Sequence, residues 1–135
     1  MSTRYLLDTN ICIYIHRHHS MAVQARFERL RPGDAVISVI TYGELLFGAE
    51  KSKARGKTLQ LLDEFIGIIP VLPLSADVPR HYGAIRATLE SHGQGIGSND
   101  TWLAAHAAAA NLTLVTNNER EFRRVEGLRV ENWIS

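Results

Sequence analysis

The stretch that decides the fold is Ala35-Val36-Ile37-Ser38-Val39-Ile40, followed at once by Thr41-Tyr42-Gly43-Glu44-Leu45-Leu46. Apolar, mostly β-branched residues occupy odd and even positions of 35–40, which predicts a strand buried on both faces. Thr41 is a suitable N-cap for a following helix that carries Glu44. A doubly buried strand that leads into a helix is the repeating unit of a parallel sheet covered by helices on both sides.

The rest of the chain repeats this alternation of short apolar runs and helical periods. We expect further strands at 5–7, 71–74, 112–115 and 128–130. Helices are expected through Ile11 and Ile15, at 21–30, after Thr41, at 55–67, from a Ser75 cap to about 92, from a Ser98 cap over 99–110, and around Phe122. The pattern predicts an α/β fold: one three-layer α/β/α domain over residues 1–135, with a central parallel sheet of about five strands.

Length and composition exclude several classes of protein. The 135 residues are 45% hydrophobic and 21% charged, with a net charge of +1, so the chain is long and apolar enough for one folded core. No apolar run reaches the ~18 residues of a membrane span, and the N-terminus lacks the pattern of a signal peptide. Cys12 is the single cysteine, which excludes a disulfide framework and multi-cysteine metal sites. We therefore expect a cytoplasmic protein without membrane contact.

The predicted topology places three acidic residues at one edge of the sheet. Asp8 comes directly after the 5–7 strand, Glu44 lies in the helix after the second strand, and Asp100 begins the helix after a glycine-rich loop. Open parallel sheets bind ligands beyond the carboxyl ends of their strands. Crowded carboxylates resist ionisation unless a cation neutralises them, and hard oxygen ligands suit Mg²⁺ or Mn²⁺. Such an ion can acidify and orient a water for attack on a phosphodiester.

Each of these acids also has a purely structural interpretation. Asp8 could be a helix N-cap, Asp100 a partner of the helix dipole, and Glu44 a surface acid, although its apolar neighbours make simple exposure less natural for Glu44. Glu119 and Glu121 are expected only to begin a short helix. The residues by themselves leave both interpretations open.

Other signatures of catalysis are weak. His106 falls six residues after Asp100, about 240° around a helix of ~3.6 residues per turn, so we expect it on another face. The glycines of 93–97 do not open a helix directly after a strand, so they match neither a dinucleotide-binding fingerprint nor a P-loop. A generic α/β phosphatase or nucleotide-binding domain therefore lacks support.

Four segments, in order and at suitable distances, resemble the PIN-domain family, and in particular the VapC-type ribonuclease toxins of type II toxin–antitoxin modules. They are YLLDTN at 5–10, ITYGEL at 40–45, IGSNDTWLAAHA at 96–107 and LVTNN at 114–118. The ending around Phe122 and Trp133 also fits, so the resemblance covers essentially the whole chain.

The resemblance implies an Mg²⁺- or Mn²⁺-dependent endoribonuclease that stops translation by cutting RNA, such as a loop of tRNA or ribosomal RNA. It implies that Asp8, Glu44 and Asp100 are metal-binding catalytic acids, with an amide, Asn118, at the family's fourth acidic position. Supporting positions would be Thr9, Asn10, Thr116 and Asn118. Basic residues that could hold RNA phosphates are Lys51, Lys53, Arg55, Arg86 and Arg120.

The resemblance also implies partners. These are a second copy of the chain in a homodimer and a small VapB-like antitoxin whose C-terminal segment fills the active groove, where one of its arginines could meet the acids. The alternative is a non-catalytic PIN module that binds nucleic acid or a DNA-binding partner and acts as a regulator. The presence of all three acids speaks against that alternative, and Asn118 leaves some room for it.

Overall fold

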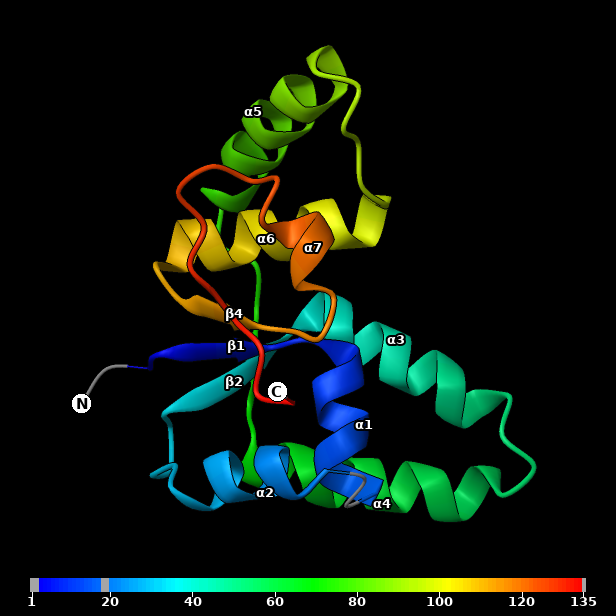
Figure 1. Cartoon of the computed structure of the whole chain (residues 1–135). Coiled ribbons are helices and arrows are strands. Elements are labelled where there is room, and N and C mark those ends of the chain that lie inside the picture. The colour runs from blue at the N-terminus through cyan, green and yellow to red at the C-terminus, as the bar shows by residue number, and fades with distance from the viewer. Residues whose placement is uncertain (1–2, 18–19, 135) are drawn as a thin grey trace.

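The computed structural model describes residues 3–17 and 20–134 of the chain (Figure 1). Its elements, in order, are β1 (Tyr5–Leu7), α1 (Thr9–Arg17), α2 (Met21–Glu28), β2 (Ala35–Ser38), α3 (Val39–Glu50), α4 (Arg55–Ile68), β3 (Val71–Leu72), α5 (Val78–Ser91), α6 (Ser98–Ala110), β4 (Thr113–Val115), α7 (Glu119–Phe122) and β5 (Val130–Glu131). In the described part of the chain, no helix combines the length and the apolar character that a membrane span requires.

The sheet has five parallel strands, as the sequence predicts, and their order is β3-β2-β1-β4-β5. The first strand of the chain, β1, lies in the centre, where Tyr5 is in register with Ala35 of β2 and Thr113 of β4. Since all strands run the same way, the residues that follow β1, β2 and β4 emerge at the same edge of the sheet.

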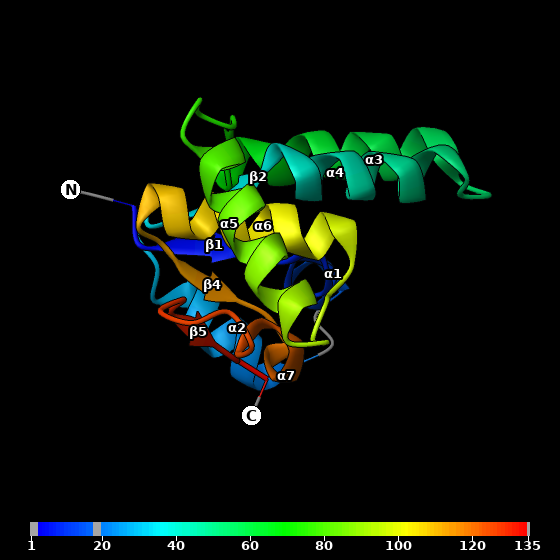
Figure 2. The same cartoon turned by 90° about the horizontal axis from the view of Figure 1, so that it is seen from above.

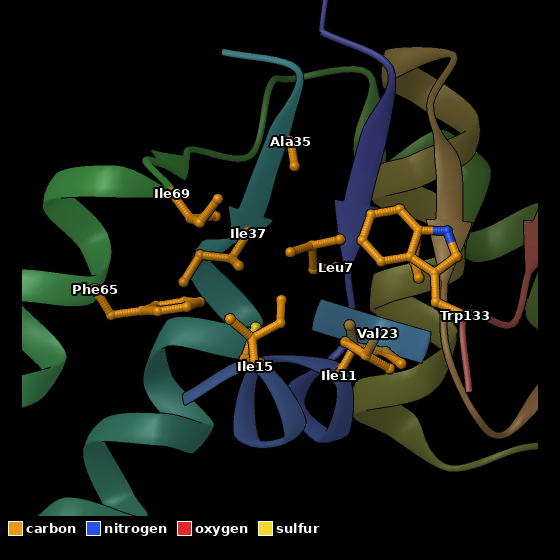
Figure 3. Close-up of a cluster of buried hydrophobic side chains, with 11 residues drawn as sticks. Leu7, Ile11, Ile15, Val23, Ala35, Ile37, Phe65, Ile69 and Trp133 are labelled. Atoms are coloured by element: carbon orange, nitrogen blue, oxygen red, sulfur yellow. The ribbon is translucent and has the colours of Figure 1, made fainter. Parts of the chain in front are cut away.

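Helices cover both faces of the sheet, which confirms the three-layer architecture. Leu6 and Leu7 are both fully buried and, as neighbours in a strand, point to opposite faces. Leu7 joins a core with side chains of α1, α2 and α4 and with Trp133 (Figure 3). Leu6 joins a second core with Leu103 and other residues of α6 and with the region around α7. In Figure 1, α5 and α6 lie on one side of the sheet and α1, α2 and α4 on the other.

The strand–helix junction after β2 differs from the prediction. The strand ends at Ser38 rather than at 40, and the Ser38 hydroxyl, not that of Thr41, caps α3 by accepting from the Ile40 backbone N–H at 3.1 Å. The predicted Thr41 cap is therefore wrong. Thr41 is fully buried within α3, and among the described residues its hydroxyl has no hydrogen-bond partner.

Smaller differences occur at other element ends. Ser75 does not cap α5, which begins at Val78 after Asp77; Ser75 instead offers its backbone carbonyl to the Val78 N–H at 3.1 Å. The helix α6 includes Ser98 and is preceded by Gly97. Strand β3 stops before Pro73, since proline has no N–H for the sheet.

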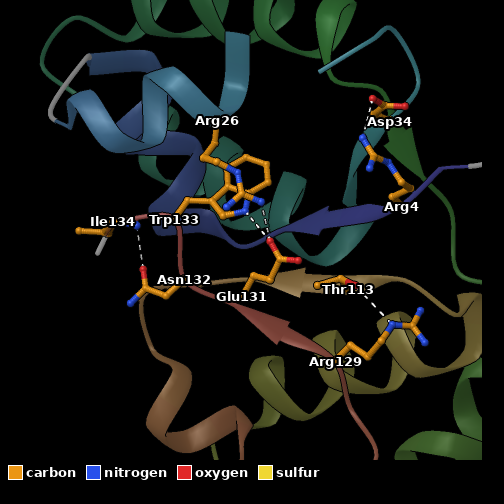
Figure 4. A network of polar contacts seen from close by, with 9 residues as sticks. All are labelled: Arg4, Arg26, Asp34, Thr113, Arg129, Glu131, Asn132, Trp133 and Ile134. Carbon is orange, nitrogen blue, oxygen red and sulfur yellow. Dashed lines mark hydrogen bonds and ion pairs between the residues drawn. The ribbon is translucent and has the colours of Figure 1, made fainter. Parts of the chain in front are cut away.

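The edge strand β5 is fastened to α2 by polar contacts (Figure 4). Glu131 accepts from the Arg26 guanidinium at 2.8 Å and from the Trp133 indole N–H at 3.0 Å. The Arg26 guanidinium also lies over the Trp133 ring, 5.1 Å from its centroid. These contacts tie β5 to α2. The helices α3 and α4 extend from the body of the molecule (Figure 2).

Candidate active site

Asp8 is held rigidly at the centre of the carboxyl edge of the sheet. Its backbone N–H donates to the Val115 carbonyl at 2.9 Å, which places the residue after β1 beside the residue after β4. The Asp8 side chain is 7% exposed, and its two oxygens accept from the Thr116 hydroxyl at 2.8 Å and from the Thr9 backbone N–H at 2.7 Å.

The pKa of Asp8 reflects competing effects. Burial raises it most, and the negative charge of Glu44 raises it further, while the hydrogen bonds from Thr116 and Thr9 lower it. The net effect is a pKa above the ordinary value of 3.8. Asp8 is therefore a fixed carboxylate whose charge is not fully compensated by the protein.

Glu44 is brought to Asp8 by the helix α3. The Thr9 hydroxyl donates to Glu44 Oε1 at 2.7 Å, while the Thr9 backbone N–H donates to Asp8. A single threonine at the start of α1 therefore orients both acids, as expected for a supporting residue.

Asp100 completes the predicted trio from the first turn of α6. Its pKa is raised to about 6, first by burial and then by the negative charges of Asp8, Glu121 and Glu44. The pKa of Asp100 on α6 is therefore affected by the charges of acids at the end of β1, on α3 and on α7.

Glu121 is the site residue that sequence reasoning missed. It does begin a short helix with Glu119, as predicted, but its charge acts on Asp100, whereas Glu119 pairs with Arg123 at 3.3 Å. Two residues apart in a helix are about 200° apart, so at most one of the two glutamates can face the acids. That spacing is a signal, although it does not say which glutamate faces inward.

The remaining supporting positions surround the acids. The Asn118 backbone N–H donates to the Thr116 hydroxyl at 2.9 Å, so the main chain at Asn118 orients the threonine that orients Asp8. The Asn118 side chain forms no capping bond to α7, and its expected role at the fourth acidic position stays a prediction. The Asn10 amide donates to the Asn117 side chain at 3.3 Å and so links α1 to the loop after β4.

The donors at this site suit a hard divalent cation in kind. All are carboxylate or hydroxyl oxygens, and none of the ion pairs found within 3–17 and 20–134 involves Asp8, Glu44, Asp100 or Glu121. Over the same ranges, no three acidic, histidine or cysteine side chains lie close enough together to hold an ion as they stand. Uncompensated carboxylates repel one another, and a bound cation would remove that repulsion.

Three of the predicted RNA-binding residues are engaged within the protein. Arg55 binds both carboxylate oxygens of Glu50 at 2.7 and 3.1 Å, and Arg86 pairs with Glu90 at 2.8 Å. The Lys51 ammonium lies 4.7 Å from the centroid of the exposed Phe47 ring.

Arg120 and Lys53 are exposed, and Arg120 lies on the same short helix as Glu121. Among the five predicted RNA-binding residues, Arg120 thus shares its helix with Glu121, an acid whose charge acts on Asp100.

A cavity of about 410 Å³ opens beside the acids, between α1, α3 and α4. Leu62 and Phe65 give it an apolar lining, Thr9 and Glu44 connect it to the site, and Arg17 contributes positive charge. Cys12 also lines this cavity, and burial raises the pKa of its thiol.

Comparison with known proteins identifies the family to which the chain belongs. Residues 5–128 match the model of the PIN domain family. The chain is 42% identical over 130 residues to the tRNA(fMet)-specific endonuclease VapC of Shigella flexneri, covering 96% of this chain and 98% of that one. It is 40% identical over 131 residues to the ribonuclease VapC2 of Haemophilus influenzae, covering 97% and 98%.

Solved structures give the same result. The chain superposes with a TM-score of 0.89 and 39% identity on a chain of VapBC2 from Rickettsia felis bound to a DNA fragment from its promoter, covering 97% of this chain and 99% of that one. For DNA-bound VapBC from Salmonella typhimurium the TM-score is 0.90 at 39% identity, covering 97% and 98%.

Proposed function

Because this chain belongs to the PIN-domain family and is a VapC-type ribonuclease toxin of a type II toxin–antitoxin module, we propose that Asp8, Glu44 and Asp100, with the charge of Glu121 nearby, hold Mg²⁺ or Mn²⁺ for endonucleolytic RNA cleavage. The observation that carries the proposal is that Thr9 donates to both Asp8 and Glu44, at 2.7 Å in each case, while burial and the charges of these two acids and of Glu121 raise the pKa of Asp100 to about 6. Bringing carboxylates together costs free energy when no cationic side chain neutralises them. Groups whose pKa values are perturbed in this way concentrate at catalytic sites.

The hydrogen bonds of each acid indicate the role that we propose for it in metal binding. Asp8, fixed by Thr116 and Thr9, and Asp100 would hold the ion, with Glu44 oriented by Thr9 and Glu121 adding negative charge. The bound ion supplies an acidified water and stabilises negative charge on the phosphate. Asp100 can also take up a proton near neutral pH when no cation is present, since its pKa is about 6.

The substrate class is an RNA loop, and tRNA is the first candidate. Unpaired loops expose bases that proteins can read, and the relative from Shigella flexneri, 42% identical, is a tRNA(fMet)-specific endonuclease. Arg120 on α7 and Lys53 after α3 are the exposed cations offered to the phosphates. Cleavage of tRNA in the cytoplasm would stop translation.

The partner is a VapB-like antitoxin, as in the VapBC complexes that superpose on this chain. The cavity between α1, α3 and α4 suits the apolar side chains of an antitoxin segment, and its end at Glu44 suits an arginine. Homodimer formation stays a prediction. A non-catalytic regulatory module is the alternative that the test below distinguishes.

The test is cleavage by the purified toxin. Wild type, Asp8→Asn and Glu44→Gln would be incubated with total tRNA and with ribosomal RNA in Mn²⁺ or Mg²⁺, and new 5′ ends mapped by sequencing. Asp63→Asn, which changes an exposed aspartate of α4, is the matched control. We expect cuts at one or a few loops with wild type and the control, and a loss of at least about 10²-fold in the site variants. Equal cleavage by a folded Asp8→Asn chain would refute the mechanism, and no cleavage by wild type would favour the regulatory module.

A further inference from the structure

A buried histidine lies behind the acids and takes no part in the mechanism described so far. His106, on α6, is 1% exposed, and its Nδ1 lies 2.8 Å from the hydroxyl oxygen of Ser38, which is fully buried. Burial lowers the pKa of His106, and a backbone hydrogen bond to Pro73 opposes that change. The ring therefore has two polar partners in the interior, and Ser38 is the one that faces Nδ1.

The partners define one tautomer of the neutral ring. The Pro73 carbonyl can only accept, so the ring must donate to it, and a neutral imidazole has a single N–H. Since Nδ1 faces Ser38, the tautomer that satisfies both partners carries its proton on Nε2 and accepts at Nδ1. The Ser38 hydroxyl accepts from the Ile40 N–H, so its own proton is free to go to Nδ1.

This chain of bonds joins the two helices that carry acids. Ser38 is the cap of α3, and Glu44 lies six residues further along that helix. His106 lies six residues after Asp100 on α6. At ~1.5 Å per residue, each acid is about 9 Å along its helix from the Ser38–His106 bond, close enough for a rigid helix to transmit a shift.

We infer that His106 is a positioning residue of the ribonuclease site: as a neutral Nε2–H ring between Ser38 and Pro73, it sets the placement of the Glu44 helix relative to the Asp100 helix. The inference rests on the proposed function, because positioning matters only if the acids act together. It gives a role to a histidine that the sequence places on another face from Asp100.

The geometry explains why a nonpolar substitute would not serve. A leucine at 106 fills similar space but cannot accept from Ser38, so the Ser38 proton loses its buried acceptor while the α3 cap remains. An asparagine can place its carbonyl oxygen near the position of Nδ1 and accept the same bond. The pair His106→Leu and His106→Asn therefore separates packing from the hydrogen bond.

The experiment compares cleavage kinetics with stability. His106→Leu is expected to lower kcat about ten- to hundredfold at nearly unchanged KM, and His106→Asn to recover most of that loss. Leu103→Val, a buried change on the same helix that leaves the bond intact, is the control. It should keep kcat within about twofold of wild type at a similar loss of Tm, since it removes packing only.

Nitrogen-15 NMR of the ring gives a readout independent of activity. We expect an unprotonated Nδ1 and a protonated Nε2 in wild type and in the inactive Asp8→Asn variant. A protonated Nδ1 overturns the inference. So does a folded His106→Leu toxin whose kcat matches wild type or merely follows Tm as Leu103→Val does. If the wild-type chain cleaves no RNA, the proposed function is overturned as well. If the wild type is active and His106→Leu cleaves equally well, only the positioning role of His106 is overturned.

Discussion

Asp100→Asn should make the metal-free protein more stable at pH 7.5 while abolishing its activity. The amide has nearly the shape of the carboxylate but cannot ionise. In the wild type, Asp100 must ionise beside Asp8, Glu121 and Glu44 in a partly buried site, which is why its pKa is raised to about 6. The substitution removes that electrostatic cost together with one ligand.

The magnitude follows from the shift. A rise from 3.8 to about 6 is worth about 3 kcal/mol at ~1.4 kcal/mol per pKa unit, as an upper bound. Solvent screening at a partly exposed side chain reduces this to about 1–2 kcal/mol. Losing the carboxylate at the start of α6 costs about 0.5 kcal/mol through the helix dipole. We therefore expect a net gain of about 1 kcal/mol in the free energy of unfolding.

The sign fixes a pH dependence. A raised folded pKa means that the protonated acid is favoured in the native state, so its contribution is fully present below 3.8 and is lost as the pH rises to about 6. The advantage of Asp100→Asn should thus be near its maximum at pH 7.5 and shrink towards pH 4.5. Adding Mn²⁺ should reverse the order, because only the wild type keeps the complete ligand set.

Urea unfolding followed by far-ultraviolet circular dichroism at pH 4.5, 6 and 7.5, in EDTA and then in Mn²⁺, measures these differences. Asp63→Asn, at an exposed position of α4, controls for the general loss of one negative charge. Two results would refute the reasoning that neighbouring charges raise the pKa of Asp100. One is an Asp100→Asn protein that is less stable than wild type at pH 7.5 in EDTA. The other is a difference in stability between the two proteins that does not change with pH.

Three further predictions concern the same site. Glu121→Gln should lower the pKa of Asp100 and move the acidic limb of the pH–rate profile to lower pH, whereas Glu119→Gln, at the glutamate paired with Arg123, should leave it in place; identical profiles would remove Glu121 from the site. Thr116→Val should cost about 1–3 kcal/mol in urea unfolding and raise the pKa of Asp8, because the buried carboxylate loses a donor; a pH–rate profile and stability equal to wild type would contradict this. Excess EDTA should stop cleavage and Mn²⁺ or Mg²⁺ should restore it, as followed by gel assay, and cleavage that persists in EDTA would exclude the metal.

The sequence predicts the architecture well because its periodicities are local. Apolar residues on both parities indicate doubly buried strands, and the parallel order then brings Asp8, Glu44 and Asp100 to one edge. The end of β2 is harder to predict, since Val39 and Ile40 suit a strand as well as a helix. Only the tertiary structure shows that the Ser38 hydroxyl caps the helix, three residues before the Thr41 cap that the pattern suggests.

The remainder of the site depends on contacts between distant segments. Whether Glu119 or Glu121 faces Asp100 depends on how a four-residue helix sits against α6, which no local pattern encodes. The Ser38–His106 bond joins residues 68 positions apart, so helical spacing could place His106 away from Asp100 but could not reveal its partner. Sequence reasoning identified the acids and missed part of what surrounds them.

The central position of β1 has a consequence for the cell that makes this toxin. Asp8 is synthesised first, but the Thr116 hydroxyl that orients it follows 108 residues later, on the segment after the neighbouring strand β4. At about 5–20 residues per second, translation takes roughly 5–20 s to cover that distance. During this interval β1 lacks its neighbour β4, so the sheet that brings the acids to one edge is incomplete. We therefore expect the acidic site to be complete only in the finished protein, which is the form that the antitoxin has to bind.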